Sequence, residues 1–338
     1  MLKKLTDAFG VSGYEDEVRD IIIEEIKDSG ADIAVDSMGN LLAFKLATEN
    51  PDAKTVLFAA HMDEVGFIVT DITDEGYIKF ASVGGIDPKV MISQRVIING
   101  HPGVVGLKPI HLTTKEDRKT TPGMDELFAD IGARSRKEAE VIVEKGDYFG
   151  FDSEYREFGN QIKAKAIDDR LGCMFMIELL KKEWNVNLVC AFTVQEEVGL
   201  RGAKLAARGI NPDFAVVLEV TTCNDITGVP DHMKLTTMGR GAAITILDSA
   251  CKTNRELVDI ISNAAESRNI PWQFKASTAG GNDSGILHML DGGIKTASVS
   301  VPCRYFHSAS CVVNKDDVKF CMDMLEGFLE DMGRSERE

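Results

Sequence analysis

The sequence predicts an α/β fold in which a mixed, mostly parallel sheet is sandwiched by helices and is interrupted by a small β-rich insert. Apolar runs with the composition of buried strands alternate with segments of helical periodicity in the first and last parts of the chain. Strands that alternate with helices form mostly parallel sheets covered on both faces. Between about residues 66 and 162 the pattern changes to short alternating runs separated by Gly, Asp and Pro, which is typical of a small barrel. We therefore expect residues 1–65 and 163–338 to form the main domain around a barrel-like insert, 66–162.

The first expected element is an amphipathic helix near the N-terminus. Ser12 and Glu15 have the spacing of a capping box, and Val18, Ile22 and Ile26 follow at helical spacing. Further helices are expected at residues 171–182, 203–208 and 255–268.

The expected strands run directly into polar residues. The apolar runs are TVLFAA before His61, NLVCAFTV before Glu196 and Glu197, DFAVVL before Glu219, and TASVSV towards His307. In open α/β sheets, ligands bind beyond the carboxyl ends of the strands. These polar side chains are therefore expected to converge on one edge of the sheet.

Composition limits the classes of partner and compartment. The 338 residues carry a net charge of −16 without a basic stripe, so nucleic acid and anionic membranes are not expected partners. No stretch reaches the roughly 20 apolar residues of a membrane span, and the N-terminal sequence does not have the form of a signal peptide. Seven cysteines without a CxxC pair suit reduced thiols. A cytoplasmic location is expected.

His61 and the acids near it are candidate metal ligands. His61 and Asp63 are one residue apart, so on an extended chain both point to the same side. Imidazole and carboxylate suit zinc, cobalt or manganese, although a histidine at a strand end is equally compatible with a structural role. Asp168 and Asp169 lie at a strand-to-helix junction, where one is expected to cap the helix and the other is free to bridge two cations.

The adjacent Glu196 and Glu197 carry the most information. Two like charges after a buried strand repel each other unless cations compensate them. One carboxylate can then bind metal while its neighbour takes a proton from water; a solvated first helical turn is the alternative explanation. Together with Glu219 and His307, the set is large enough for two metal ions.

A glycine-rich turn, TAGGNDSG, spans residues 278–285. It is compatible with a plain loop or with a loop that shapes a substrate pocket. Gly281 and Asp283 are its candidate substrate-binding residues.

These segments together resemble the family of cobalt- or zinc-dependent tetrahedral aminopeptidases, which includes glutamyl aminopeptidases and members named endoglucanases. The motifs that carry the resemblance occur in the family's order over nearly the whole chain: VSGYEDEVRD, AAHMDEVGF, VGGIDP, DIGARS, KAIDDRLGC, TVQEEVGLRGA, GGNDSG and VPCRYFHS. The resemblance implies a Zn-peptidase-like α/β domain whose insert is a dimerisation domain. It also implies that dimers assemble into a dodecameric tetrahedron.

The resemblance further implies a role for each candidate residue. His61 and Glu219 belong to different divalent ions (zinc or cobalt, with manganese as a third option), Asp168 bridges the two ions, Glu197 and His307 complete their shells, Glu196 is the general base, and Asp63 orients His61. The expected activity is the release of N-terminal residues from short peptides, with a metal-bridging hydroxide as the nucleophile. Three positions depart from the family's commoner pattern: Glu219 replaces Asp, GNDSG replaces a Gly-Thr-Asp-Ala-Gly turn, and Ala309 replaces Pro.

Three other functions remain open at this point. A metal-dependent N-acyl amino acid deacylase would use the same chemistry but would not need a free amine. A glycoside hydrolase would use two carboxylates roughly 5–9.5 Å apart and no metal. A metal-binding scaffold would show no turnover.

Overall fold

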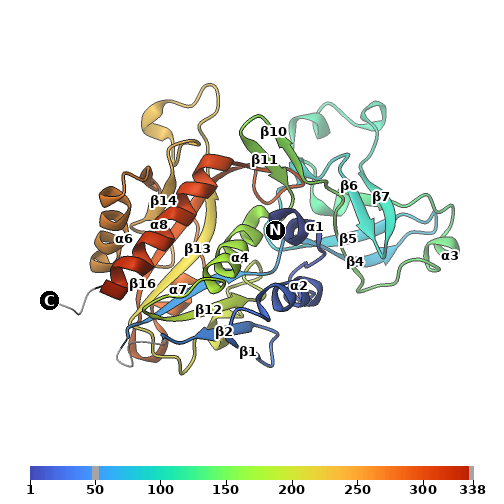
Figure 1. Ribbon diagram of the computed structural model, residues 1–338. Coiled ribbons are helices and arrows are strands. Elements are labelled where there is room, and N and C mark those ends of the chain that lie inside the picture. Colours follow the sequence, from blue (N-terminus) through green and yellow to red (C-terminus); the bar gives the residue numbers. More distant parts are fainter. Residues whose placement is uncertain (48–52, 335–338) are drawn as a thin grey trace.

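The computed structural model describes residues 1–47 and 53–334, in which a large sheet with its helices lies beside a separate barrel (Figure 1). The sheet has 11 strands, and six other strands close into the barrel. The expected α/β class with a β-rich, barrel-like insert is confirmed.

The helices of the described residues are α1 (Leu2–Asp7), α2 (Asp16–Ile26), α3 (Arg136–Ala139), α4 (Ile167–Leu180), α5 (Ala203–Ala206), α6 (Arg255–Ser267), α7 (Ser284–Leu287) and α8 (Lys315–Arg334). The strands of the large sheet are β1 (Asp32–Val35), β2 (Leu41–Lys45), β3 (Thr55–His61), β10 (Arg156–Phe158), β11 (Gln161–Ala164), β12 (Asn187–Thr193), β13 (Phe214–Thr222), β14 (Ala242–Thr245), β15 (Trp272–Phe274), β16 (Lys295–Arg304) and β17 (Cys311–Asn314). The barrel strands are β4 (Gly66–Ile72), β5 (Ile78–Val83), β6 (Arg95–Ile98), β7 (His101–Gly106), β8 (Phe128–Asp130) and β9 (Tyr148–Phe151).

The centre of the large sheet is parallel. Strands β12, β3, β13 and β16 are neighbours in that order, and each adjacent pair is parallel. The flanking pairs, such as β2 with β12 and β16 with β17, are antiparallel. The four parallel strands therefore direct their carboxyl ends to the same edge.

Residues alternate between two helical layers along each central strand. Val56, Phe58 and Ala60 of β3 belong to the larger apolar core, which includes residues of α1, α2, α4, α6 and α8. Leu57 and Ala59 belong to a smaller core formed with α5 and α7. Because side chains alternate across a strand, these two cores lie on opposite faces of the sheet.

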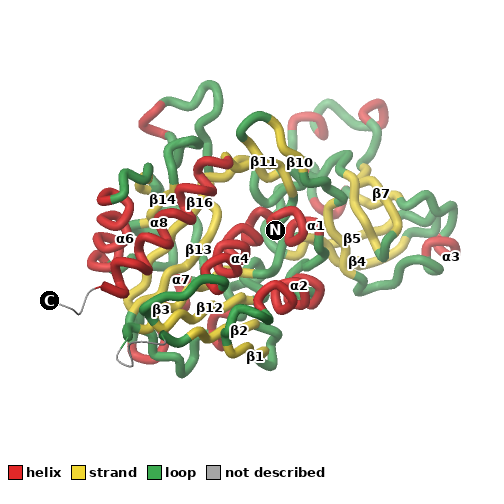
Figure 2. Tube along the Cα trace, in the orientation of Figure 1, coloured by secondary structure: helices red, strands yellow, loops and turns green. Residues whose placement is uncertain are grey.

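The barrel is a closed antiparallel structure with an aromatic core. Phe67 packs against Phe149 at a ring-centroid distance of 5.0 Å, and Phe80 contacts both rings. Figure 2 shows strands and loops with only short helices in this part of the chain. Strands β10 and β11 follow the barrel but pair with each other, and β11 also pairs with β17 of the large sheet. The division into domains at residues 66 and 162 stays a prediction.

The N-terminal helix forms as expected, but its capping box does not. Helix α2 buries Val18, Ile22 and Ile26, and its N-cap residue Glu15 makes no side-chain capping bond. The hydroxyl of Ser12 instead donates to Asp63 at 2.5 Å. The prediction was wrong because α2 begins at Asp16 with Glu15 as its N-cap residue, so Ser12 lies before the cap position.

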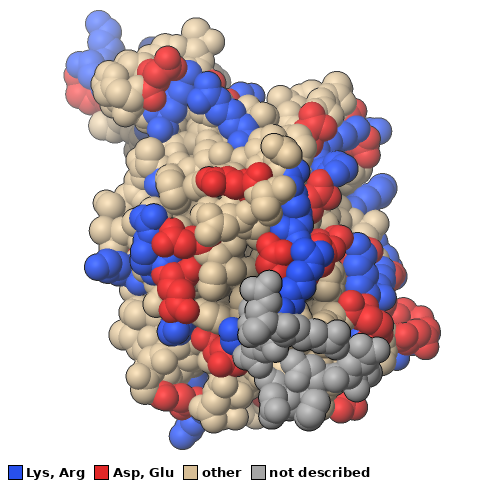
Figure 3. Space-filling model, turned by 60° about the vertical axis from the view of Figure 1, so that its left-hand side comes forward, with Lys and Arg blue, Asp and Glu red and all other residues tan. Residues whose placement is uncertain are grey.

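The surface shown in Figure 3 carries Lys and Arg side chains interspersed with Asp and Glu. Ion pairs also join elements: Arg268, the C-cap residue of α6, pairs with Glu330 and Asp331 of α8. All seven cysteines are buried and unpaired, as expected. Among the described residues, no helix has the length and apolar character needed to cross a bilayer.

Candidate active site

Four polar residues form a row across the central strands. Thr193 pairs with His61, and Glu219 pairs with Ser300. The register of β3 and β13, with Val217 opposite Ala59, brings Glu219 level with His61 two residues later. All four continue the face that α5 and α7 cover further back in the sheet. Strand β13 runs three residues past Glu219, so Glu219 lies inside the strand and not at its end as the sequence suggested.

The ring of His61 is held from one side and faces acids on the other. Its Nδ1 lies 3.0 Å from the carbonyl oxygen of Asp63. Its Nε2 lies 3.3 Å from Asp168 Oδ1 and 3.9 Å from Glu219 Oε1. A histidine whose second nitrogen is fixed in this way presents a defined nitrogen to a metal.

His307 repeats this arrangement on the other side of Asp168. Its Nδ1 lies 2.8 Å from the carbonyl oxygen of Gly85, and its Nε2 lies 3.2 Å from Glu197 Oε1 and 3.4 Å from Asp168 Oδ2. Asp168 therefore directs one oxygen to each imidazole. Glu219 lies beside His61, and Glu197 lies beside His307. Which of these residues share an ion stays a prediction.

These side chains fit divalent cations. The site contains two groups of potential ligands, and within each group the donor atoms lie within 4.8 Å of one another. The groups are His61 with Asp168 and Glu197, and His61 with Asp169 and Glu219. Asp168 Oδ1 and Asp169 Oδ2 are buried and have no hydrogen-bond partner in the described part of the chain. Buried carboxylate oxygens of this kind are costly unless a cation or proton compensates them. Imidazole and carboxylate together suit zinc, cobalt or manganese.

The electrostatics of the site reflect an excess of negative charge. Burial, together with Asp168, raises the pKa of Glu219 well above its usual value. Burial also raises the pKa of Glu197, despite its contact with His307. Although burial opposes protonation of His307, Asp168 and Glu197 raise its pKa to about 11. Cations among these groups would replace the protons that the acids otherwise retain.

Asp63 and Glu196 are linked through the backbone. The carboxylate of Asp63 accepts hydrogen bonds from the amides of Glu196 at 3.0 Å and Glu197 at 3.1 Å. The side chain of Glu196 lines the cavity of the site, and burial, more than the neighbouring acids, raises its pKa well above the usual value. Glu196 is thus placed to exchange a proton with a bound molecule.

The cavity has a volume of about 640 Å³. Its walls include the six residues His61, Asp168, Glu196, Glu197, Glu219 and His307. Gly281 lines the cavity, whereas Asp283 lies behind the wall with 1% exposure and accepts a hydrogen bond from Thr193 at 2.6 Å. Burial raises the pKa of Asp283 to about 6. A substrate role for either residue stays a prediction.

The sequence interpretation missed two contributors to the site. Asp169 lies in the first turn of α4, where its Oδ1 accepts from the Gly172 amide at 3.0 Å. It also belongs to one of the groups of potential metal ligands, and its Oδ2 has no hydrogen-bond partner among the described residues. The paired aspartates were a signal that both could serve the site. Gly85 holds His307 through its backbone carbonyl, which no side-chain pattern reveals.

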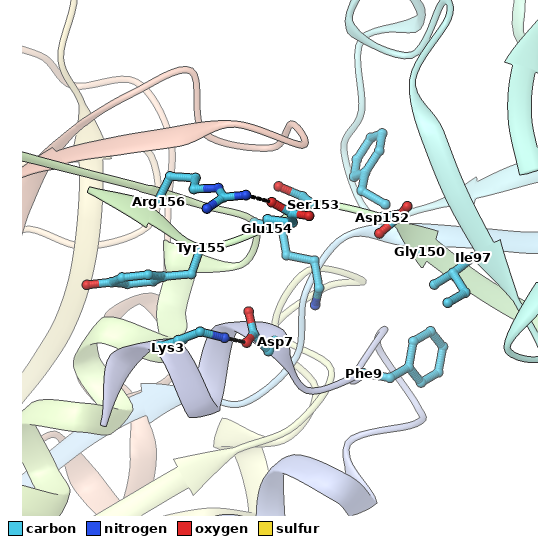
Figure 4. A pocket seen from close by; sticks show the side chains of 12 residues that line it. Lys3, Asp7, Phe9, Ile97, Gly150, Asp152, Ser153, Glu154, Tyr155 and Arg156 are labelled. Carbon is cyan, nitrogen blue, oxygen red and sulfur yellow. Dashed lines mark hydrogen bonds and ion pairs between the residues drawn. The ribbon is translucent and has the colours of Figure 1, made fainter. Parts of the chain in front are cut away.

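A second hollow of about 510 Å³ lies where α1, the barrel and residues 153–156 meet (Figure 4). Four of its charged side chains form two ion pairs, Lys3 with Asp7 and Arg156 with Glu154. It contains none of the grouped metal-ligand candidates. Among the described residues, the grouped metal-ligand candidates therefore lie at the other cavity.

In sequence and in fold, the chain is similar to known peptidases. A family model described as M42 glutamyl aminopeptidase matches residues 39–324. An aminopeptidase candidate of Acetivibrio thermocellus is 38% identical over 327 residues, which cover 96% of each chain. Two solved structures are similar over nearly the full length. Aminopeptidase APDkam598 from Desulfurococcus kamchatkensis has a TM-score of 0.93 and 32% identity, covering 100% of this chain and 96% of its own. The TET1 peptidase of Pyrococcus horikoshii, described as assembling into a tetrahedron or a large octahedral shell, has a TM-score of 0.86 and 34% identity over 98% of each chain.

The fit to cations predicts a metal-dependent stability. Addition of Zn²⁺ or Co²⁺ to metal-stripped protein should raise the free energy of unfolding, by about 2.7 kcal/mol at one hundred times the dissociation constant. Asp168→Asn should lose most of this gain in thermal denaturation. Asp231→Asn makes the same chemical change at a side chain that is 96% exposed and should keep it. A full gain in Asp168→Asn would contradict the placement of Asp168 at the centre of the site.

Proposed function

Because the chain belongs to the M42 glutamyl aminopeptidase family, we propose that it is a dinuclear metal-dependent aminopeptidase that removes N-terminal residues from short peptides. The position of Asp168 between two imidazoles, with one oxygen towards each, carries this proposal. A carboxylate beside each imidazole gives two similar sets of ligands around a shared aspartate. A structural site for a single zinc would need only four ligands.

The proposed ligand sets follow the distances. On these distances His61 and Glu219 would hold one ion, His307 and Glu197 would hold the other, and Asp168 would offer one oxygen to each. Asp63 acts on His61 from outside this set. Zinc and cobalt suit these donors, and manganese is also compatible with them.

When bound, such ions supply Lewis-acid chemistry that polarises the scissile carbonyl and makes water a better nucleophile at neutral pH. Glu196 accepts the proton of the attacking water on its carboxylate and delivers it to the leaving amine. Its raised pKa supports this role, because a proton carrier works best when its pKa lies near the operating pH. The acids of the cavity also attract the positively charged amine of a peptide N-terminus, which favours exopeptidase activity.

The glutamate pair offers a matched test of the proposed roles. Glu196→Gln should lower kcat roughly 10²- to 10⁴-fold and leave the metal affinity of the apo-protein unchanged. Glu197→Gln, the same change one residue away, should weaken metal binding in a calorimetric titration. If Glu196→Gln kept near-normal turnover with metals bound, the assignment of the base would be wrong.

A substrate panel separates this function from its rivals. With Zn²⁺ or Co²⁺ added, the protein should hydrolyse aminoacyl reporters and short peptides, fail on their N-acetylated forms, and lose all activity with a chelator. Turnover of acylated amino acids alone would identify a deacylase. Cleavage of oligosaccharides that persists with chelator would identify a glycoside hydrolase, and inactivity on every substrate would favour a scaffold.

We also propose that the chain self-associates through the insert at residues 66–162, with dimers building a dodecameric tetrahedron, in the cytoplasm. The similarity to a peptidase described as a tetrahedral or octahedral assembly supports this, and seven unpaired cysteines fit a reducing compartment. Light scattering should give a mass of about twelve 37.0 kDa subunits. A monomeric mass would contradict the proposal, and a dimeric mass would limit it to the first step.

A further inference from the structure

The backbone that carries the two glutamates needs outside support. We call Gln195–Glu197 the catalytic turn. Gln195 has a positive φ of 55°, a left-handed conformation that costs free energy for a residue other than glycine. Because such a conformation persists only where surrounding contacts hold it, the contacts of this turn decide where Glu196 and Glu197 point.

Three successive amides of the catalytic turn donate to two buried carboxylates. The amide of Gln195 donates to Glu15 at 3.1 Å, and the amides of Glu196 and Glu197 donate to Asp63 at 3.0 and 3.1 Å. Glu15 is 4% exposed and Asp63 is fully buried. Hydrogen bonds from amides to buried carboxylates are stronger than those between neutral groups.

Both carboxylates are held from the N-terminal arm, residues 10–15, which connects α1 to α2 near the centre of Figure 1. Ser12 donates to Asp63 at 2.5 Å, and the amide of Gly13 donates to Glu15 at 2.7 Å. The arm also pairs with the chain just after His61, through a bridge between Val11 and Glu64.

A buried arginine fixes the start of the arm. Arg170 has no exposed surface and donates to the carbonyl oxygens of Leu5 at 2.6 Å, Gly10 at 3.4 Å and Met62 at 2.7 Å. The arm is therefore fastened to the end of β3 and to α4, which are the two elements that supply His61 and Asp168.

We propose that Ser12 and Glu15 are positioning residues of the active site, which set the orientation of Glu196 and Glu197 by holding the catalytic turn. Glu15 acts directly on the turn, and Ser12 acts through Asp63. Neither residue lines the cavity. Only the expected effect on kcat rests on the proposed function; the effect on the catalytic turn does not.

Amide hydrogen exchange tests the proposal without activity or metal. Glu15→Ala should increase exchange in peptides that cover the catalytic turn of the apo-protein and leave β12 protected. The matched control is Glu17→Ala, because Glu17 also accepts a backbone amide, that of Phe9 at 3.2 Å, without reaching the turn. Equal exchange of the turn in the two variants would overturn the proposal.

Kinetics at saturating metal provide the second measurement. Glu15→Ala should lower kcat on the order of 10- to 100-fold with KM little changed, whereas Glu15→Gln, which retains an acceptor oxygen, should recover most of the rate. In a Glu196→Gln background at saturating metal, Glu15→Ala should cost much less, since one of the two carboxylates that it positions is already lost. An equal loss in both backgrounds would indicate general damage and would overturn the proposal.

Ser12→Ala gives an independent variant if Glu15→Ala does not fold. It should raise exchange in the catalytic turn, and Ser12→Thr, which keeps the hydroxyl, should restore protection. Wild-type exchange in Ser12→Ala would overturn the role of Ser12. If Glu196→Gln remained fully active while the exchange results held, the proposed base would be wrong and the positioning role would stand.

Discussion

The crowding of carboxyl groups at the carboxyl edge of the central sheet is the constraint on which the rest of the structure depends. Seven acidic residues lie in or next to the walls of the site cavity, and most of them are buried: Asp63, Asp168, Asp169, Glu196, Glu197, Glu219 and Asp283. Buried like charges repel and keep protons that they would lose in water, as the raised pKa of Glu219 shows. Two imidazoles alone offset only part of this charge. Divalent cations bound between the carboxylates would compensate the remaining negative charge.

The fold holds these acids by two different means. The register of the parallel strands places His61 and Glu219 level with each other, so their approach follows from sheet geometry alone. The loop residues depend on hydrogen bonds to side chains and carbonyls, as His307 does on Gly85. Asp63 contacts both groups of residues. Its backbone carbonyl oxygen lies next to the His61 ring, and its carboxylate accepts from the amides of Glu196 and Glu197 after β12. A change at Asp63 would therefore disturb both halves of the site together.

The strands and the convergence of their polar residues could be predicted from the sequence, because an apolar run followed by a polar residue indicates where a buried strand reaches the edge of the sheet. The sequence could not predict which of these side chains lie next to each other. Which glutamate lies beside which histidine depends on register and on the path of two loops, and neither leaves a local pattern. The Ser12 hydroxyl illustrates the same limit. Its spacing to Glu15 indicated a helix cap, yet a carboxylate 51 residues away in the chain is its partner.

The barrel is physically part of the site, although the chain forms it as an insert. The loop after β5 supplies the Gly85 carbonyl that fixes the His307 ring, and Tyr148 of β9 packs on Tyr14 of the N-terminal arm with ring centroids 4.4 Å apart. A shift of the barrel relative to the sheet would move both contacts. The first contact holds His307, a metal-ligand candidate, and the second lies next to Glu15, which holds the catalytic turn. A contact that held the barrel in place, such as the proposed self-association would provide, would therefore also hold His307 and the N-terminal arm in place.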